Sequence, residues 1–153
     1  MIRVQAEDFD PAVELAGFFA GNGAVGGVCV FVGLVRDTLG EEHAPGLVRG
    51  MTLEHYPGMT ERQLEAIEAE ARRRWPISDC LVIHRHGRLA PGERIVLVAT
   101  ASAHREAAFE SCHFLIDWLK TRAPFWKVEH TEAGDHWVEA RASDDAAAKR
   151  WGD

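Results

Sequence analysis

The stretch KTRAPFWK (residues 120–127) closes a long helical pattern and opens an aromatic, strand-like run. Pro124 cannot continue a helix, because its ring lacks an amide donor and restricts the residue before it. The stretch therefore predicts a corner between a helix and a strand, with Lys120 on one side and Lys127 on the other. The rest of the chain is arranged around this corner.

The lysines of this stretch stand out because lysine is rare in the chain. Of 17 basic side chains only three are lysines, and the third is Lys149. A lysine beside another cation or partly buried can lose its proton, whereas an arginine effectively cannot. Lys120 and Lys127 therefore suggest proton chemistry or a shaped anion site. The alternative is a helix that ends in cations because they interact favourably with its dipole.

Composition limits the classes of function. A chain of 153 residues is expected to form a single domain over residues 1–153. A formal net charge of −7 argues against general nucleic-acid binding, since phosphate contacts need a basic face. It leaves room for a local basic pocket that binds a small anion.

Cysteine usage and hydropathy predict the compartment. No apolar run approaches the roughly 20 residues that span a bilayer, and no signal-like apolar segment precedes the first helix, so we expect no membrane association. Cys29, Cys80 and Cys112 are far apart and lie in apolar surroundings. They are typical of reduced thiols in a cytoplasmic protein.

Hydrophobic periodicity predicts an α+β domain with a mixed or antiparallel sheet and flanking helices. Strands are expected over residues 2–6, 24–35, 51–56, 80–85, 94–100, 125–131 and 136–140. Helices are expected from Asp10-Pro11, from about Met59 to Pro76, from a cap at Ser102 to about residue 122, and from Asp144. Thr60 and Gln63 have capping-box spacing, although an earlier start of that helix is equally compatible. Gly33 indicates a bulge or a close backbone approach, and residues 37–49 a surface loop.

Other candidate groups lie away from the corner. His104 and Arg105 begin the long helix, where unpaired backbone amides favour an anion, and Arg36 follows a buried strand. Surface arginines are usually only solvated. His104 and Lys120 are sixteen residues apart, which at 1.5 Å per residue is roughly 24 Å. Either they belong to different sites, or a second subunit or a long ligand tail spans them. His84 and His86 lack a third ligand, so no metal site is expected.

Six segments of the chain together resemble the catalytic (large) subunit of molybdopterin synthase, the MoaE family. The resemblance extends from about residue 24 to the C-terminus, in the family's order and with nearly its spacing. The segments are FVGLVR (31–36), TLEHYPGM (52–59), VIHR (82–85), SAHR (102–105), LKTRAPFWK (119–127) and WVEAR (137–141).

This resemblance implies an α/β-hammerhead fold and a sulfurtransferase of molybdenum cofactor biosynthesis. Such enzymes form a homodimer that becomes a heterotetramer when a small ubiquitin-like sulfur-carrier subunit binds at each end. The carrier's thiocarboxylated Gly-Gly tail enters the large subunit and transfers sulfur twice to cyclic pyranopterin monophosphate, giving molybdopterin. No cofactor is implied.

The resemblance also assigns site residues. Lys120 and Lys127 match the family's catalytic lysines. Five residues match the family's substrate and anion-binding positions: Arg36, His104, Arg105, Arg141 and Phe31. In the family, one of these positions is filled by the C-terminal arginine of the neighbouring subunit.

Two departures from the family pattern concern the charge of this pocket and the access to it. Leu34 stands where a lysine is expected, and the 37–50 loop is longer than usual. The competing interpretations are a non-catalytic relative that binds a ubiquitin-like tail, and an unrelated enzyme that forms a Schiff base on Lys120.

Overall fold

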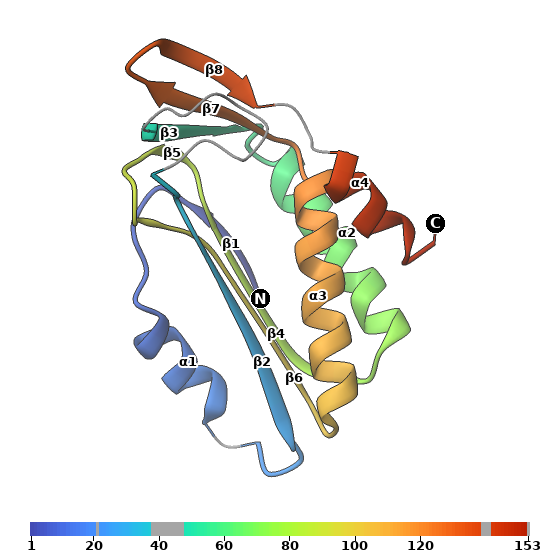
Figure 1. Ribbon diagram of the computed structural model, residues 1–153. Coiled ribbons are helices and arrows are strands. Elements are labelled where there is room, and N and C mark those ends of the chain that lie inside the picture. Colours follow the sequence, from blue (N-terminus) through green and yellow to red (C-terminus); the bar gives the residue numbers. More distant parts are fainter. Residues whose placement is uncertain (21, 38–47, 139–141, 153) are drawn as a thin grey trace.

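The computed structural model describes residues 1–20, 22–37, 48–138 and 142–152. Over these residues the chain forms two four-stranded sheets flanked by helices, as Figure 1 shows. The predicted α+β class and the α/β-hammerhead-like arrangement are confirmed. None of the helices described is long and apolar enough to cross a bilayer.

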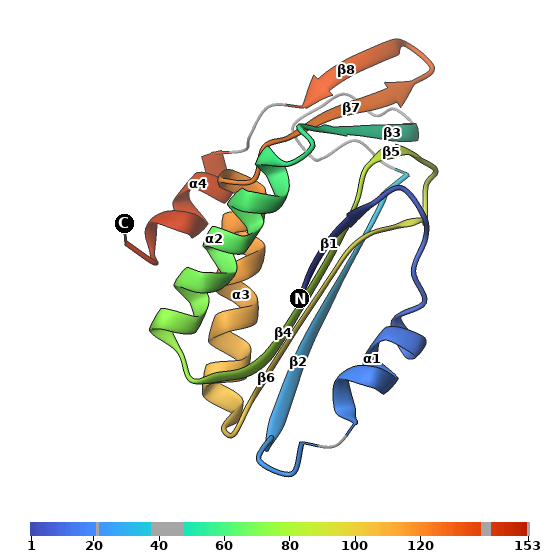
Figure 2. The same cartoon turned by 180° about the vertical axis from the view of Figure 1, so that it is seen from behind.

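The first sheet has the strand order β1-β4-β6-β2. β1 (Ile2–Gln5) and β4 (Ile77–Arg85) are parallel, whereas β6 (Arg94–Ser102) pairs antiparallel with β4 and with β2 (Gly27–Leu34). One face is covered by α2 (Met59–Arg74) and α3 (Arg105–Thr121), and the other by α1 (Pro11–Phe19) (Figures 1 and 2). β2 therefore lies at the edge of this sheet, beside α3.

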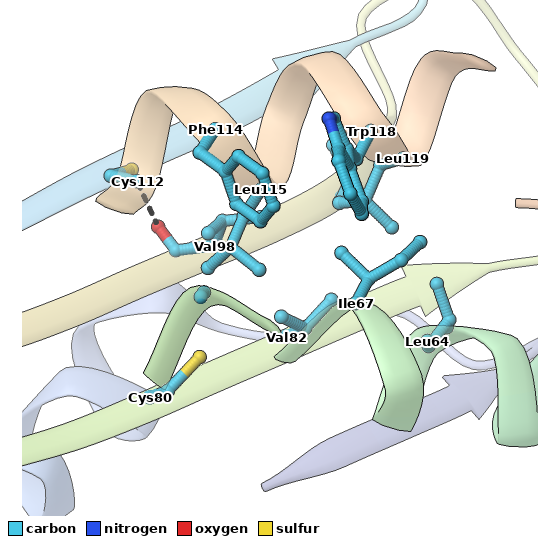
Figure 3. Close-up of a cluster of buried hydrophobic side chains, with 12 residues drawn as sticks. Leu64, Ile67, Cys80, Val82, Val98, Cys112, Phe114, Leu115, Trp118 and Leu119 are labelled. Carbon is cyan, nitrogen blue, oxygen red and sulfur yellow. Dashed lines mark hydrogen bonds between the residues drawn. The ribbon is translucent and has the colours of Figure 1, made fainter. Parts of the chain in front are cut away.

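The alternation of side chains along β4 explains this three-layer arrangement. Leu81 and Ile83 pack with Phe9 in a cluster that also contacts α1, while Cys80 and Val82 face the two long helices. The larger core lies between β4, β6 and the helices, as Figure 3 shows. Its members from the helices include Leu64, Ile67, Phe114, Leu115 and Trp118.

The second sheet is antiparallel, with the order β5-β3-β7-β8, and lies across one end of the first sheet and the two long helices (Figure 1). Its strands are β5 (Gly87–Leu89), β3 (Val48–His55), β7 (Phe125–Thr131) and β8 (Gly134–Val138). Val35, Met51, Leu53 and Leu89 fill the junction between the sheets. α4 (Ala142–Lys149) follows and packs on α3.

The sequence missed part of the second sheet. β5 was not predicted, because three residues are too few to show a period. β3 begins at Val48, so residues 48 and 49 belong to a strand rather than to the predicted loop, of which residues 38–47 lie outside the described part. The predicted irregularity at Gly33 is confirmed: the register shifts there, and a Cβ would approach Val96 Cγ1 to 2.8 Å.

One predicted helix cap is wrong, and for the helix near Met59 the alternative of an earlier start is confirmed. Ser102 ends β6 instead of capping α3, and its hydroxyl donates to the Pro76 carbonyl at 2.9 Å. α2 begins after Gly58, whose amide donates to the Glu61 carboxylate at 2.6 Å. Thr60 is fully buried instead, with its hydroxyl 3.5 Å from the Pro124 carbonyl.

The helix-to-strand corner is confirmed. α3 ends at Thr121, the Arg122 amide donates to the Trp118 carbonyl at 2.8 Å, and β7 begins at Phe125 directly after the proline. The contact of Thr60 with Pro124 ties the first turn of α2 to this corner. The corner thus joins the long helical layer to the second sheet.

Candidate active site

Lys120 lies in the last turn of α3, where the helix dipole favours a cation. Its side chain is 55% exposed, and its Nζ lies 3.5 Å from Oδ1 of Asp144 on α4. The Asp144 side chain is half as exposed, at 25%. The ammonium is therefore held by one carboxylate and still open to solvent.

Lys127 lies on β7, opposite Leu53 of β3 and Val138 of β8. Residues directly opposite on antiparallel strands share a face of the sheet, so the lysine stem lies on the face that Leu53 packs into the junction between the sheets. Its Nζ is 3.2 Å from Oε1 of Glu129, two residues further along the same strand face. The Glu129 side chain is only 12% exposed.

His104 and Arg105 lie at the amino end of α3. His104 is the N-cap residue, with extended backbone and no side-chain capping bond, and Arg105 is the first helical residue. Both are exposed, and neither side chain forms an ion pair with any residue in the described part of the chain. The Arg105 guanidinium, the His104 ring and the unpaired amides of the first turn together form a helix terminus that can receive an anion.

The remaining predicted residues lie on or after β2. Phe31 is 40% exposed on this edge strand, opposite Val98. Arg36 is exposed and follows Val35, which is buried in the junction between the sheets. Arg141 lies outside the described residues.

The structure divides these residues into two groups. Arg36, Lys120 and Lys127 belong to the end of the molecule where α3 and β2 meet the second sheet (Figure 1). His104 and Arg105 lie at the opposite end of the seventeen-residue α3, about 24 Å from Lys120 at 1.5 Å per residue. A single chain therefore does not bring the predicted groups into one pocket, as the spacing in the sequence indicated.

Sequence reasoning missed the carboxylates that hold the lysines. Glu129 follows Lys127 by two residues on a predicted strand. Because side chains on a strand alternate between its two faces, the sequence already indicated that Glu129 and Lys127 share a face. Asp144 is 24 residues from Lys120 in the sequence, and no local pattern links the two.

A group of rings under the corner was also missed. The His84 ring stacks on Phe125 with centroids 3.7 Å apart, and the His55 and His86 rings are 4.2 Å apart. Burial, together with the neighbouring His55 and His86, lowers the pKa of His84 to about 4, against its hydrogen bond to the Arg85 carbonyl. At neutral pH the His84 ring is therefore uncharged, and it packs against the Phe125 ring as an aromatic group. No cluster of histidine, cysteine or acidic side chains within the described ranges has an arrangement that could hold a metal ion.

The fold places the chain in a class of known proteins. The structure of the molybdopterin biosynthesis MoaE protein from Burkholderia ambifaria superposes with a TM-score of 0.82 and 53% sequence identity, covering 100% of this chain and 98% of that one. The molybdopterin synthase catalytic subunit of Pseudomonas aeruginosa is 57% identical over 98% of this chain and 97% of its own length. That of Mesorhizobium japonicum is 52% identical over 98% and 92%.

The family model described as "MoaE protein" matches residues 4–122. The chain therefore belongs to the MoaE family, whose curated relatives are molybdopterin synthase catalytic subunits. The family and the enzyme class predicted from the sequence are confirmed.

Proposed function

We propose that this chain catalyses two transfers of sulfur, from the thiocarboxylated Gly-Gly tail of a small ubiquitin-like carrier subunit to cyclic pyranopterin monophosphate, giving molybdopterin. The observation that carries the proposal is the pair of lysines on either side of the corner between α3 and β7, in a chain of this family. The relatives' name, catalytic subunit, supports the presence of a second subunit.

The charges of the two reactants explain the need for such a site. The precursor carries a phosphate and the tail carries a thiocarboxylate, so they repel each other and are also repelled by a protein of net charge −7. Local cations are needed to bring them together. Arginine provides a planar fork of donors that suits phosphate, and lysine provides a compact ammonium.

Each residue then has a role. Lys120, half exposed at the end of α3, positions the tail and transfers protons as the cyclic phosphate opens and oxygen leaves the pterin side chain. Lys127 supplies charge and binds the substrate. The substrate's anionic groups and ring are bound by Arg36, His104, Arg105, Arg141 and Phe31.

Two of the cysteines are poorly suited to relay sulfur. Cys80 is fully buried, and burial raises the pKa of its thiol to about 12. Burial also raises the pKa of Cys112, helped by the neighbouring Cys29. Thiolates are the reactive form, so at neutral pH neither buried thiol is a nucleophile. This supports direct transfer from the carrier tail to the precursor.

A homodimer reconciles this chemistry with the two separated groups. One chain keeps His104 and Arg105 about 24 Å from Lys120. A second copy can place its own cations beside the first copy's lysines, so that each site is completed in a heterotetramer of two large and two small subunits. We also propose a cytoplasmic location, supported by three free cysteines in apolar surroundings.

The test is reconstitution with a thiocarboxylated carrier subunit and the cyclic precursor, measuring molybdopterin formation. Lys120→Ala is expected to lower turnover by about 10²- to 10⁴-fold, the usual contribution of a positioned proton-transfer group. Lys149→Ala, a lysine at the end of α4, is the matched control and should remain near wild type.

Near-normal turnover of a folded Lys120→Ala variant contradicts the proposed role of this lysine. A wild-type chain that binds the carrier tightly but forms no product identifies a non-catalytic relative instead. Borohydride trapping of a carbonyl substrate on Lys120 identifies a Schiff-base enzyme.

A further inference from the structure

The C-terminal segment is fastened to α3 by one buried carboxylate. Asp117 is 7% exposed, and its Oδ2 accepts hydrogen bonds from Arg150 Nη2 at 3.0 Å and from Trp151 Nε1 at 2.7 Å. His113 Nε2 lies 3.6 Å from the same oxygen. A buried carboxylate with such partners is costly to leave unpaired, so release of the segment is disfavoured.

Aromatic packing strengthens this attachment. The Trp151 ring lies edge-on to Phe114 and Trp75, with centroids 5.7 Å and 5.5 Å away. Arg74 of α2 donates a hydrogen bond to the Trp151 carbonyl. The segment that contains α4 is thus held both by Asp117 and by the core between the helices.

This attachment determines where Asp144 lies. Asp117 and Lys120 are three residues apart on α3 and therefore neighbours on its surface. With its C-terminal end bound at Asp117, α4 places the carboxylate of its first turn 3.5 Å from the Lys120 ammonium. Asp145, the next residue, is exposed and forms no ion pair within the described part of the chain.

The Lys120–Asp144 contact has little value for stability. The Lys120 side chain is 55% exposed, and solvent-exposed ion pairs contribute little to folding because water screens them and two long side chains lose freedom. Its effect on the lysine's geometry is larger. A lysine stem has four rotatable bonds, and a fixed carboxylate restricts where its ammonium lies.

We propose that Asp144 is a positioning residue for Lys120, and that the Asp117 attachment of α4 keeps its carboxylate within reach. The inference rests on the proposed function of Lys120 and deepens it. It assigns a role to α4, which lies beyond residues 4–122, the part of the chain that the family model matches. The C-terminal helix is thereby part of the active site's support.

The test compares variants of Asp144, Asp145 and Asp117 in the reconstituted reaction, with kcat and KM measured separately for the carrier and the precursor. Asp144→Asn keeps the size of the side chain and removes its charge, and should lower kcat by about 10- to 100-fold, the usual range for a misplaced catalytic group. Asp144→Glu should restore most of the rate. Asp145→Asn removes the same charge one residue away and should remain near wild type.

Asp117→Asn tests the attachment without altering either partner of the ion pair, and should reproduce the Asp144→Asn defect in kcat. In a Lys120→Ala background, Asp144→Asn should cause no further loss, because the residue acts only through the lysine. Thermal unfolding confirms that each variant is folded.

The two proposals fail in distinguishable ways. If Lys120→Ala retains normal turnover, the proposed function of the lysine fails. If Lys120→Ala is inactive while folded Asp144→Asn turns over like wild type, only the positioning role is overturned. An equal loss of kcat in Asp145→Asn and Asp144→Asn also overturns the positioning role, because the effect then comes from net charge.

Discussion

The two ends of α3 are built by different physical means. At the amino end, backbone packs against backbone: a Cβ on Gly26 would lie 2.2 Å from the Ala103 carbonyl oxygen, and one on Gly27 would lie 3.5 Å from Arg105 Cα. At the carboxyl end, side chains pair by charge, as in the Lys120–Asp144 contact. Steric packing fixes the first end, and electrostatic contacts orient the second.

This difference between the two ends corresponds to a difference in proposed role. Arg105 at the amino end binds the substrate, and Lys120 at the carboxyl end takes part in the chemistry. At the amino end, His104 and Arg105 have no carboxylate partner in the described part of the chain and are open to an external anion. The lysines at the carboxyl end are each already held by a carboxylate. An unpaired Arg105 is available to bind the substrate, whereas Lys120, which transfers protons, benefits from a defined position. Four predictions test this contrast.

The largest effect on stability is expected in the core that supports the middle of α3. Phe114 is fully buried and contacts Trp75, Trp118 and Trp151, so Phe114→Ala should lower the free energy of unfolding by about 3–5 kcal/mol, measured by urea denaturation. Phe109→Ala, on the same helix but 60% exposed, should change it by less than about 0.5 kcal/mol. Equal effects of the two would show that this core does not support α3.

A smaller effect is expected at the amino end. Arg105→Ala removes a charged donor to the substrate, worth about 1.5–3 kcal/mol, and should raise KM for the precursor by about 10- to 100-fold with little change in kcat. Arg73→Ala, whose side chain is 71% exposed on α2, is the matched control. A selective loss in kcat would instead place Arg105 in the chemical step.

The third prediction concerns pH. Burial is the main reason why the pKa of His84 falls from its ordinary 6.5 to about 4 in the folded chain. Between these values the unfolded chain binds a proton that the folded chain does not, so the unfolding free energy should fall as pH drops from about 6.5 to about 4. One such histidine contributes at most about 1.4 kcal/mol per pH unit.

Urea unfolding at several pH values checks this. The slope over the window should be smaller in His84→Gln, while His136→Gln, at an exposed position of β8, should leave it unchanged. Part of the slope should remain in His84→Gln, because burial also lowers the pKa of His86. An identical slope in His84→Gln and wild type would contradict the prediction.

The smallest effect concerns the ion pair itself. Because the Lys120 side chain is more than half exposed, Asp144→Asn should change the free energy of unfolding by less than about 1 kcal/mol. Measured against the expected loss in kcat, this would show that the pair acts in catalysis rather than in folding. A change of several kcal/mol would make Asp144 a structural residue.

Most elements of the fold were predictable because their signals are local. Asp10 accepts a hydrogen bond from the Ala12 amide with Pro11 in the first turn, as the cap pattern predicted. The break at Pro124 was visible because proline is incompatible with an uninterrupted helix. The cap at Ser102 was mispredicted, and Thr60 does not cap α2, because their hydroxyls bond to distant carbonyls, those of Pro76 and Pro124.

The candidate site was predictable in its residue types but not in its arrangement. The rarity of lysine and the corner indicated Lys120 and Lys127, the start of the long helix and the end of a strand indicated Arg105 and Arg36, and the family resemblance added Arg141 and Phe31. The pairing of Lys120 with Asp144 could not be foreseen, because it depends on where Arg150 and Trp151 bind Asp117. An interaction between residues far apart in the sequence produces no periodic pattern of side chains, so the sequence gives no local signal of it.

The sequence by itself determined the family, the α+β class and the two lysines at the corner, since propensity, periodicity and proline sterics all act over a few neighbouring residues. Only the tertiary structure decided that the strands divide into two sheets, that His84 is buried against Phe125, and that α4 brings a carboxylate to Lys120. These features arise from the packing of distant segments, whose free energy depends on burial and charge in three dimensions.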